Sequence, residues 1–467
     1  MIEQQKIDHL IFLEKVFSTN LRFGDLRGNK NFIDPFLNYL SILEESQYWP
    51  EDLRNEIRLR RLEKLMSYLS KNSSFWAEYF KKNNFDSNTI DTLDRLDSLP
   101  ILRRADLLEF GEKIYVVNDE NKDYISSQNS SGTSGIPTKF LFDNREQLTA
   151  AFALQFRHPF LMKLPLRNML ERKFIVMLGG KGAAYLLAKD FVVKVFQVAP
   201  ADLEDKDIRL SIYNAIEQAR PTLLISFPSL LIKLAQMINE DKISLPLLAI
   251  QLSGESISAE DNVFLQKIFN VPIANLVSNS GLGGAIGFEC GKQFGVFHLN
   301  AEQVMLEFID ENDKKVPLGK DGELTITSLA YSATPLLRYA IDDTGNFLTT
   351  KCVCGKTLPV FNFIGRRNNE FILPSGNRIG ALHFYIALAY AQIQRYSKQF
   401  QIIQEDKNLL RLLIVPKMRP NITHEAKFRL ALTKLFQNEK VFIEIDYVER
   451  IPERGRKPVF FIPLSQD

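Results

Sequence analysis

The sequence has 467 residues, of which 45% are hydrophobic, and its 58 Lys and Arg residues nearly balance 56 Asp and Glu residues. A chain of this length and apolar content forms two or three domains with a sizeable core. The formal charge of +2 gives no broad basic field, so a nucleic-acid-binding function is not expected.

The N-terminus and the cysteine content predict a cytoplasmic protein. Three cysteines cannot form a disulfide framework. Residues 1–14 include Glu3, Lys6 and Asp8 and lack the apolar core of a signal peptide. The most apolar stretch, 174–196, carries four charged side chains, so it cannot cross a bilayer as one run of about 20 apolar residues. We therefore expect no membrane span.

The first hundred residues are expected to be mainly helical, because residues 54–80 place apolar side chains at helical spacing. Between about 174 and 329, short apolar runs alternate with helical patterns. Strands are expected at 174–178, 223–226, 248–252 and 271–277, and helices at 207–218 and 229–239. This alternation is typical of an α/β sheet.

After Gly365 the pattern changes to that of a small α+β domain. A helix at 380–394 is followed by strands at 399–404 and 409–415, a helix at 423–437 and a strand at 441–448. The predicted fold class is therefore α/β, with a large N-terminal domain over 1–364 and a small α+β domain over 365–467.

The loop between 126 and 138 is dense in hydroxyl and glycine residues. Short hydroxyl side chains donate hydrogen bonds, and glycine lets backbone N–H groups approach an anion, so the loop suits a polyphosphate. A solvated Ser/Gly connector is the commoner structure for such a composition. The loop is not a Walker motif, because no lysine follows Gly135.

The three cysteines and one histidine have the spacing of a metal site. Cys290 is followed by His298, and Cys352 and Cys354 form a Cys-x-Cys-Gly knuckle. Three thiolates and an imidazole are a closed, structural Zn²⁺ ligand set, and Gly355 lets the knuckle turn. Three reduced, partly buried cysteines beside an incidental histidine remain the alternative.

The loop at 130–138 resembles the signature loop of adenylate-forming enzymes, and its Pro137-Thr138 ending is similar to the phenylacetate-coenzyme A ligase branch. Further segments match in the same order along the chain. They are Leu99-Pro100-Ile101-Leu102, the adenine-contacting turn Gly254-Glu255-Ser256, the stretch Arg338-Tyr339-Ala340-Ile341-Asp342-Asp343, the interdomain hinge at Gly365-Arg366, and the C-terminal lysine motif ending at Lys457. The resemblance implies an AMP-binding domain followed by a mobile lid.

Adenylation brings a carboxylate to the α-phosphate of ATP, so the site needs phosphate donors and a cation. The resemblance implies Thr133, Arg366 and Lys457 as catalytic residues, with Lys457 bridging the nucleophile and the α-phosphate. Asp343 is implied to accept the ribose hydroxyls. The other implied nucleotide contacts are Ser130, Ser131, Gly132, Ser134, Gly135, Thr138, Gly254, Glu255, Ser256, Ser280 and Gly281.

One motif departs from the family. Where the family has Tyr-Gly-x-Thr/Ser-Glu, this chain has Ser280-Gly281-Leu282-Gly283-Gly284, which removes an adenine contact and a Mg²⁺ ligand. Magnesium usually keeps several waters, so its binding need not be abolished. Arg456 also precedes Lys457 where the family usually has glycine.

The resemblance implies ATP-dependent activation of an aryl or other hydrophobic carboxylate as an acyl-adenylate. The acyl group then passes to the thiol of coenzyme A or of an acyl carrier protein. The implied cofactors are ATP, Mg²⁺ and coenzyme A, with structural Zn²⁺, since some members of the branch resemble the Cys/His arrangement. Two alternatives remain open: a catalytically weakened nucleotide-binding scaffold or regulator, and a nucleotidyl transferase acting on a non-carboxylate acceptor.

The acyl pocket is expected between Tyr185 and Ser229 and at 277–282, where apolar side chains gather. His158 lies next to Arg157 and is expected to be structural. Lys181 is expected to be an exposed loop lysine rather than an anion contact.

Overall fold

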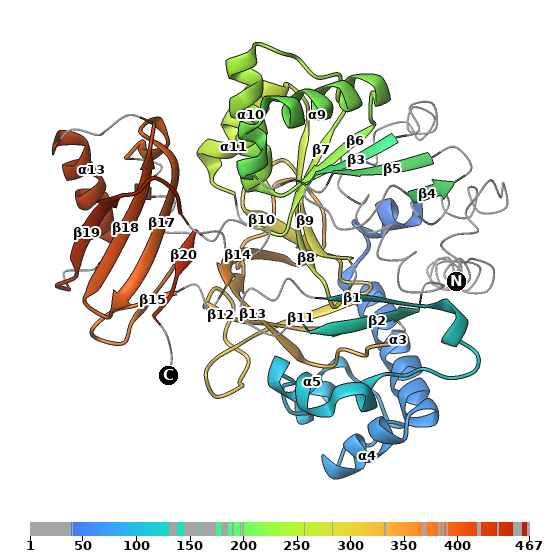
Figure 1. Ribbon diagram of the computed structural model, residues 1–467. Coiled ribbons are helices and arrows are strands. Elements are labelled where there is room, and N and C mark those ends of the chain that lie inside the picture. The colour runs from blue at the N-terminus through green and yellow to red at the C-terminus, as the bar shows by residue number, and fades with distance from the viewer. Residues whose placement is uncertain are drawn as a thin grey trace.

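The computed structural model describes residues 39, 41–129, 138–143, 157, 174–178, 185–188, 191–196, 198, 200–255, 257–282, 284–330, 333–366, 370–381, 384, 387–388, 391–417, 422–436, 439–451 and 460–464. Within them, a large mixed sheet with helices is joined to a smaller four-stranded sheet at the C-terminal end (Figure 1). The α/β class is therefore confirmed. Among all the residues that the structure describes, no helix has the length and apolar character that a bilayer crossing requires.

The described residues among the first hundred, 39 and 41–100, are mainly helical, as predicted, but the pattern at 54–80 forms two helices. They are α3 (Glu51–Asn72) and α4 (Ser74–Lys82), followed by α5 (Arg104–Phe110). Ser73 separates the first two because its backbone is extended and its hydroxyl accepts a hydrogen bond from Trp76 N, which caps α4. Apolar side chains of both helices, including Leu65 and Trp76, enter the largest hydrophobic core.

The main sheet has twelve strands in the order β11-β12-β13-β14-β10-β9-β8-β7-β6-β3-β5-β4. Its first strands along the chain are β3 (Phe174–Leu178), β4 (Tyr185–Ala188), β5 (Phe191–Phe196), β6 (Leu223–Ser226), β7 (Ile250–Ser253) and β8 (Ile273–Asn279). Neighbours from β5 through β3, β6 and β7 to β8 run parallel. Helices α9 (Lys206–Ala219), α10 (Pro228–Asp241) and α11 (Ala259–Phe269) pack beside these strands (Figure 1).

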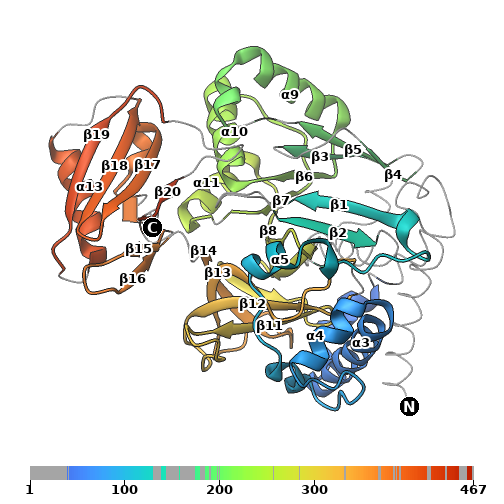
Figure 2. The same ribbon diagram turned by 60° about the horizontal axis from the view of Figure 1, so that its bottom comes forward.

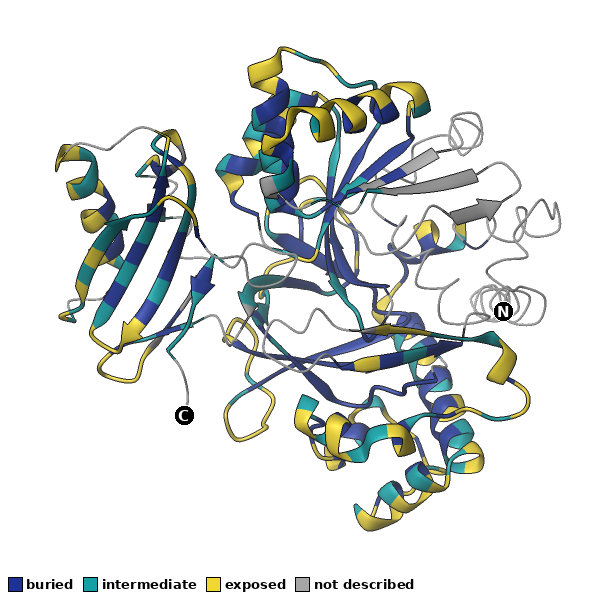
Figure 3. Cartoon of the chain, in the orientation of Figure 1, coloured by how far each residue is buried: buried dark blue, intermediate teal, exposed yellow. Residues whose placement is uncertain are grey.

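The predicted alternation of strands and helices ends at α11 rather than near residue 329. The strands β9 (Gly284–Glu289), β10 (Val296–Leu299), β11 (Val304–Ile309), β12 (Gly322–Ser328), β13 (Tyr339–Phe347) and β14 (Val360–Arg366) follow. They pair antiparallel with one another. The strands from β9 to β12 are buried along their whole length (Figure 3). These four strands therefore lie in the interior of the described part of the chain.

The C-terminal part contains the sheet β19-β18-β17-β20 and its own hydrophobic core. Its elements are β15 (Glu370–Ile372), β16 (Arg378–Gly380), β17 (Ser397–Asp406), β18 (Leu409–Pro416), α13 (Ile422–Thr433), β19 (Phe442–Tyr447) and β20 (Phe461–Ile462). The helix predicted at 380–394 ends earlier, because Gln392 has a left-handed backbone (φ 62°) and a 3-10 turn follows at Ile393–Arg395. The strands predicted at 399–404, 409–415 and 441–448 are confirmed as β17, β18 and β19 to within two residues at each end.

Candidate functional site

A β-hairpin holds the two ends of the Ser/Gly-rich loop. Strand β1 (Ile125–Asn129) pairs antiparallel with β2 (Lys139–Asp143), and the innermost pair joins Asn129 to Lys139. The candidate residues Ser130, Ser131, Gly132, Thr133, Ser134 and Gly135 lie outside the described residues. Thr138 is described and is buried at the start of β2. Strands β1 and β2 thus hold the two ends of this segment, Asn129 and Lys139, side by side.

This hairpin is anchored to the segment that leads into β13. Leu141 N donates to the hydroxyl of Thr334 (2.7 Å), and the Tyr115 hydroxyl donates to Lys139 O (3.1 Å). Phe140 is 2% exposed and meets the edge of the Tyr339 ring at a centroid distance of 6.4 Å. In the view of Figure 2 the hairpin lies between the parallel strands and the β11–β13 strands. The loop ends and the start of β13 therefore belong to one packed body.

Asp343 and Arg366 lie on neighbouring strands. They are direct partners in the antiparallel register of β13 and β14, and Asp343 is 8% exposed. Arg366 is described only through its backbone. Asp342, just before, has a left-handed backbone (φ 59°), a conformation that Asp tolerates better than most residues. The fold thus brings together the two residues for which the sequence implied ribose and phosphate contacts.

Arg338 ties β13 to the segment at 99–102. Its guanidinium is 4% exposed, pairs with both carboxylate oxygens of Glu307 (3.0 and 3.2 Å) and donates to Leu99 O (2.6 Å). The backbone adds two bonds, from Leu102 N to Arg338 O (3.0 Å) and from Ala340 N to Leu102 O (2.8 Å). Sequence reasoning found both segments by resemblance but did not indicate that they are neighbours, because no local pattern encodes such a contact.

The turns after β7 and β8 lie at the same edge of the sheet, because these strands are parallel neighbours. Gly254 has φ 82°, which favours glycine there, and the Glu255 carboxylate accepts a hydrogen bond from Ser229 N in the first turn of α10 (3.0 Å). In the second turn, Gly281 N donates to Asn279 Oδ1 (2.8 Å). The implied adenine-contacting turn and the altered family motif therefore face a common edge.

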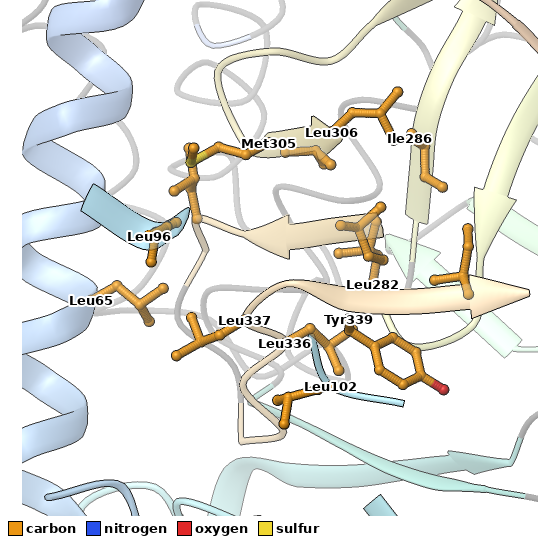
Figure 4. Close-up of a cluster of buried hydrophobic side chains, with 14 of the residues drawn as sticks. Leu65, Leu96, Leu102, Leu282, Ile286, Met305, Leu306, Leu336, Leu337 and Tyr339 are labelled. Carbon is orange, nitrogen blue, oxygen red and sulfur yellow. The ribbon is translucent and has the colours of Figure 1, made fainter. Parts of the chain in front are cut away.

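The altered turn is tied into the core. Leu282 is 6% exposed and lies in the same cluster as Ile286 of β9, Tyr339 of β13 and Leu65 of α3 (Figure 4). A Cβ atom on Gly281 would lie 2.9 Å from side-chain carbons of Leu336 and Phe140, so a larger residue here would have to displace these side chains. Val277, expected in the acyl pocket, is also part of this core.

The four predicted metal ligands lie together. Their ligand atoms are all within 4.8 Å of one another, with Cys290 Sγ 3.5 Å from Cys352 Sγ and Cys354 Sγ 3.4 Å from His298 Nε2. Tetrahedral Zn²⁺ with Zn–S bonds of about 2.3 Å places its sulfur ligands about 3.8 Å apart. Burial lowers the pKa of His298 to about 4, helped by the charges of Lys356 and Arg157, so the imidazole is neutral. The donor set and its spacing fit zinc.

The metal-ligand cluster lies far from the sheet edge that carries the turns after β7 and β8. Cys290 follows the last residue of β9, whereas Ser280 and Gly281 precede its first residue. A six-residue strand spans about 20 Å at its rise of about 3.4 Å per residue. Cys352 and Cys354 likewise lie in the connection between β13 and β14, at the other end of β14 from Arg366. A metal ion held by these four residues would therefore lie at the opposite ends of β9 and β14 from Gly281 and Arg366.

Four of the remaining predicted positions, Ser256, Lys457, His158 and Lys181, lie outside the described residues. Arg157, next to His158, is described and fully buried. Sequence reasoning did not single out its partner Glu302, with which it forms an ion pair (Arg157 Nη1 to Glu302 Oε2, 2.5 Å), because 145 residues separate the two in the chain.

Comparisons with known proteins agree with this architecture, although no family model matches the sequence. The chain is 23% identical over 419 residues to protein CapK of Staphylococcus aureus, covering 87% of this chain and 88% of that protein. It is 24% identical over 350 residues to phenylacetate-coenzyme A ligase of Thermus thermophilus, covering 71% and 75%.

Among solved structures, the chain is similar to a 2-hydroxyisobutyryl-CoA ligase in the postadenylation state. The TM-score is 0.70 at 17% sequence identity, with 90% of this chain and 93% of that chain covered. At this level of identity the comparison shows a similar fold only. The similarity covers nearly the whole of both chains. The two sequence relatives and the structural neighbour therefore agree with the ordered motifs: the chain is similar to proteins of the adenylate-forming superfamily, among them a phenylacetate-coenzyme A ligase.

Proposed function

We propose that the protein is an ATP-dependent acid–thiol ligase. It activates a carboxylate as an acyl-adenylate and transfers the acyl group to a thiol, that of coenzyme A or of an acyl carrier protein. The observation that carries the proposal is the joining of the hairpin β1–β2, which holds the phosphate loop, to the start of β13, which bears Asp343 opposite Arg366. The ligase names of the relative from Thermus thermophilus and of the structural neighbour support it.

In this proposal each element contributes one part of the chemistry. Donors of the loop, including Thr133 and Ser134, hold the β- and γ-phosphates, and Asp343 accepts hydrogen bonds from the ribose hydroxyls. A substrate carboxylate oxygen attacks the α-phosphorus and pyrophosphate leaves. Arg366 and Lys457 neutralise the charge that this step concentrates on the α-phosphate. The turns at Gly254 and Ser280 form the edge against which adenine lies.

Magnesium is held mainly through ATP in this proposal. The chain lacks the glutamate that the family places at the position of Gly284. Because Mg²⁺ commonly binds through substrate phosphates and waters with only one or two carboxylates, the ion can accompany the nucleotide without this ligand. The proposed substrates are aryl or other hydrophobic acids.

Carboxylate-dependent exchange of pyrophosphate into ATP tests the function. With Mg²⁺ and a panel of aryl, short aliphatic and hydroxylated acids, we expect exchange that requires one class of acid and is absent without acid. Pyrophosphate exchange at the same rate with every acid and without acid would support nucleotidyl transfer instead. ATP binding by calorimetry without exchange on any acid would support the weakened scaffold, and the ligase proposal would then be wrong.

We further propose that Cys290, His298, Cys352 and Cys354 hold one structural Zn²⁺ ion. The spacing of their ligand atoms supports this. Zinc would join the connection between β9 and β10, which carries Cys290, to the connection between β13 and β14, which carries the knuckle. A closed set of four protein ligands leaves no open position for a substrate.

Metal analysis of the purified protein is expected to give about one zinc per chain. Replacing Cys352 by serine removes a ligand, so zinc content should fall and Tm should drop by about 5 °C or more, since metal binding to such a site contributes directly to folding. Val353 lies between the two knuckle cysteines and is 81% exposed, so Val353→Ser is the matched control and should keep both zinc and Tm. A zinc content near zero with an unchanged Tm in Cys352→Ser would contradict the proposal.

A further inference from the structure

The knuckle is followed directly by residues that hold the N-terminal segment. Thr357 N donates to Gln47 O (2.8 Å), and the Thr357 hydroxyl lies 2.6 Å from Trp49 O. Arg54 of α3 binds the same threonine, with bonds to its hydroxyl (2.7 Å) and its carbonyl (2.6 Å). We call this set of Gln47, Trp49, Arg54 and Thr357 the clasp.

Lys356 adds a second contact between the same two segments. Its ammonium group donates to the Tyr48 hydroxyl (3.0 Å) and lies 4.7 Å from the centre of the Tyr48 ring. Two successive residues of the connection, 356 and 357, thus bind three successive residues of the N-terminal segment, 47 to 49.

The connection that carries Thr357 has little regular support of its own. It runs from the end of β13 at Phe347 to the start of β14 at Val360. Its base is closed by the bonds from Leu348 N to Val360 O (3.0 Å) and from Leu299 N to Pro359 O (2.9 Å). Within the knuckle, the described backbone bond from Gly355 N to Cys352 O is long, at 3.5 Å. At the knuckle itself, the thiol groups of Cys352 and Cys354, which lie 3.5 Å from Cys290 Sγ and 3.4 Å from His298 Nε2 respectively, are the points through which a bound metal ion would hold the tip to β9 and β10.

We infer that zinc bound by the four metal ligands stabilises the clasp. The bound ion fixes the tip of the β13–β14 connection, and the clasp then holds the segment at 47–54 against the sheet. This inference rests on the zinc site proposed above and assigns that site a role in the N-terminal region. Thr357 lies only three residues beyond Cys354, so movement of the knuckle shifts the threonine itself.

Bonds to Glu302 hold the N-terminal region independently of the knuckle, so loss of zinc should affect only a short segment. Ser46, one residue before the clasp, donates to Glu302 Oε1 (2.6 Å), and Arg61 of α3 donates to Glu302 O. These bonds do not involve the connection that carries the knuckle. Loss of zinc should therefore loosen residues 47–54 while α3 beyond this point stays packed.

Hydrogen exchange measured by mass spectrometry on the full chain tests the clasp. Zinc-loaded protein is compared with the same protein after chelation, and with chelated protein given Zn²⁺ again. We expect exchange in a peptide covering 47–54 to become about tenfold faster without zinc and to recover when zinc returns. A peptide covering α10 is the internal reference and should not change.

The variant Thr357→Val distinguishes the effect of the clasp from the effect of the metal. The variant removes the hydroxyl but no metal ligand, so it should keep its zinc and still exchange faster over 47–54. If zinc is present and removable but exchange over 47–54 does not change, the clasp inference is wrong and the zinc site stands. If purified protein holds no zinc, the metal site itself is wrong, and the clasp with it. Pyrophosphate exchange reports on the ligase function separately.

Discussion

Replacing Lys457 by alanine is expected to slow carboxylate-dependent pyrophosphate exchange by about 10²–10³-fold, the usual effect of removing one charge-stabilising donor from a transition state. Lys457 lies outside the described residues, and its role rests on the resemblance of the C-terminal lysine motif. A lysine bridging the attacking carboxylate and the α-phosphate reduces the repulsion between two anions. The rate is measured at saturating ATP and acid, so that kcat rather than binding is compared.

Two controls make this result specific. Lys434 is an exposed lysine of the same C-terminal part, and Lys434→Ala should leave exchange unchanged. Thiol transfer from a supplied acyl-adenylate does not form a bond at phosphorus, so Lys457→Ala should affect it far less than exchange. Undiminished exchange in Lys457→Ala would exclude this residue from the adenylation step.

Replacing Arg157 by methionine is expected to destabilise the protein by about 3–5 kcal/mol, because it leaves the buried charge of Glu302 without its partner. Both side chains are fully buried. Arg157 donates to both Glu302 oxygens, at 2.5 and 2.6 Å, and Ser46 adds a further bond at 2.6 Å. The free energy of unfolding at pH 7, from urea titration, measures the loss.

The matched control is the double variant Arg157→Met, Glu302→Leu, which removes both charges. It should recover part of the lost stability, since an apolar pair of similar volume often replaces a buried ion pair at little cost. A double variant that is less stable than Arg157→Met would show that the charge left on Glu302 was not the main cause.

The same ion pair gives the stability a defined dependence on pH. Burial alone would raise the pKa of Glu302, but the charge and hydrogen bonds of Arg157 outweigh it and lower this pKa from 4.5 to about 2. The unfolded chain therefore takes up the proton first. The stabilisation is complete above pH 4.5 and is lost as the pH falls toward 2. Glu302→Gln, measured at pH 7 and pH 3, should lose less stability on acidification than the wild type.

Local sequence patterns predicted the parallel half of the main sheet well. Strands β3 and β6 have the predicted bounds, and the predicted helices at 207–218 and 229–239 lie within α9 and α10. The antiparallel half was not resolved into strands by the same reasoning. Strands β9 to β12 are buried on both faces, so they show no alternation of polar and apolar residues from which a strand or its partners can be inferred.

In the candidate site, too, short sequence motifs could be recognised, whereas contacts between residues far apart in the sequence could not be predicted. The spacing of Cys352 and Cys354 indicates a knuckle, and the ligand atoms of Cys290 and His298 lie within 4.8 Å of those of the knuckle. The bonds of Arg338 to Leu99 and of Arg54 to Thr357 span 239 and 303 residues. No periodicity or motif links such residues, because these contacts depend on the strand order of the whole sheet.

The direct pairing of Asn129 with Lys139 has a consequence for engineering the chain. This innermost pair sets the separation of the two backbone ends to which the segment 130–138 is attached, and Phe140, one residue beyond it, is buried. A replacement segment grafted between Asn129 and Lys139 would therefore have to match that separation. It would also need at position 138 a side chain that can be buried, as that of Thr138 is.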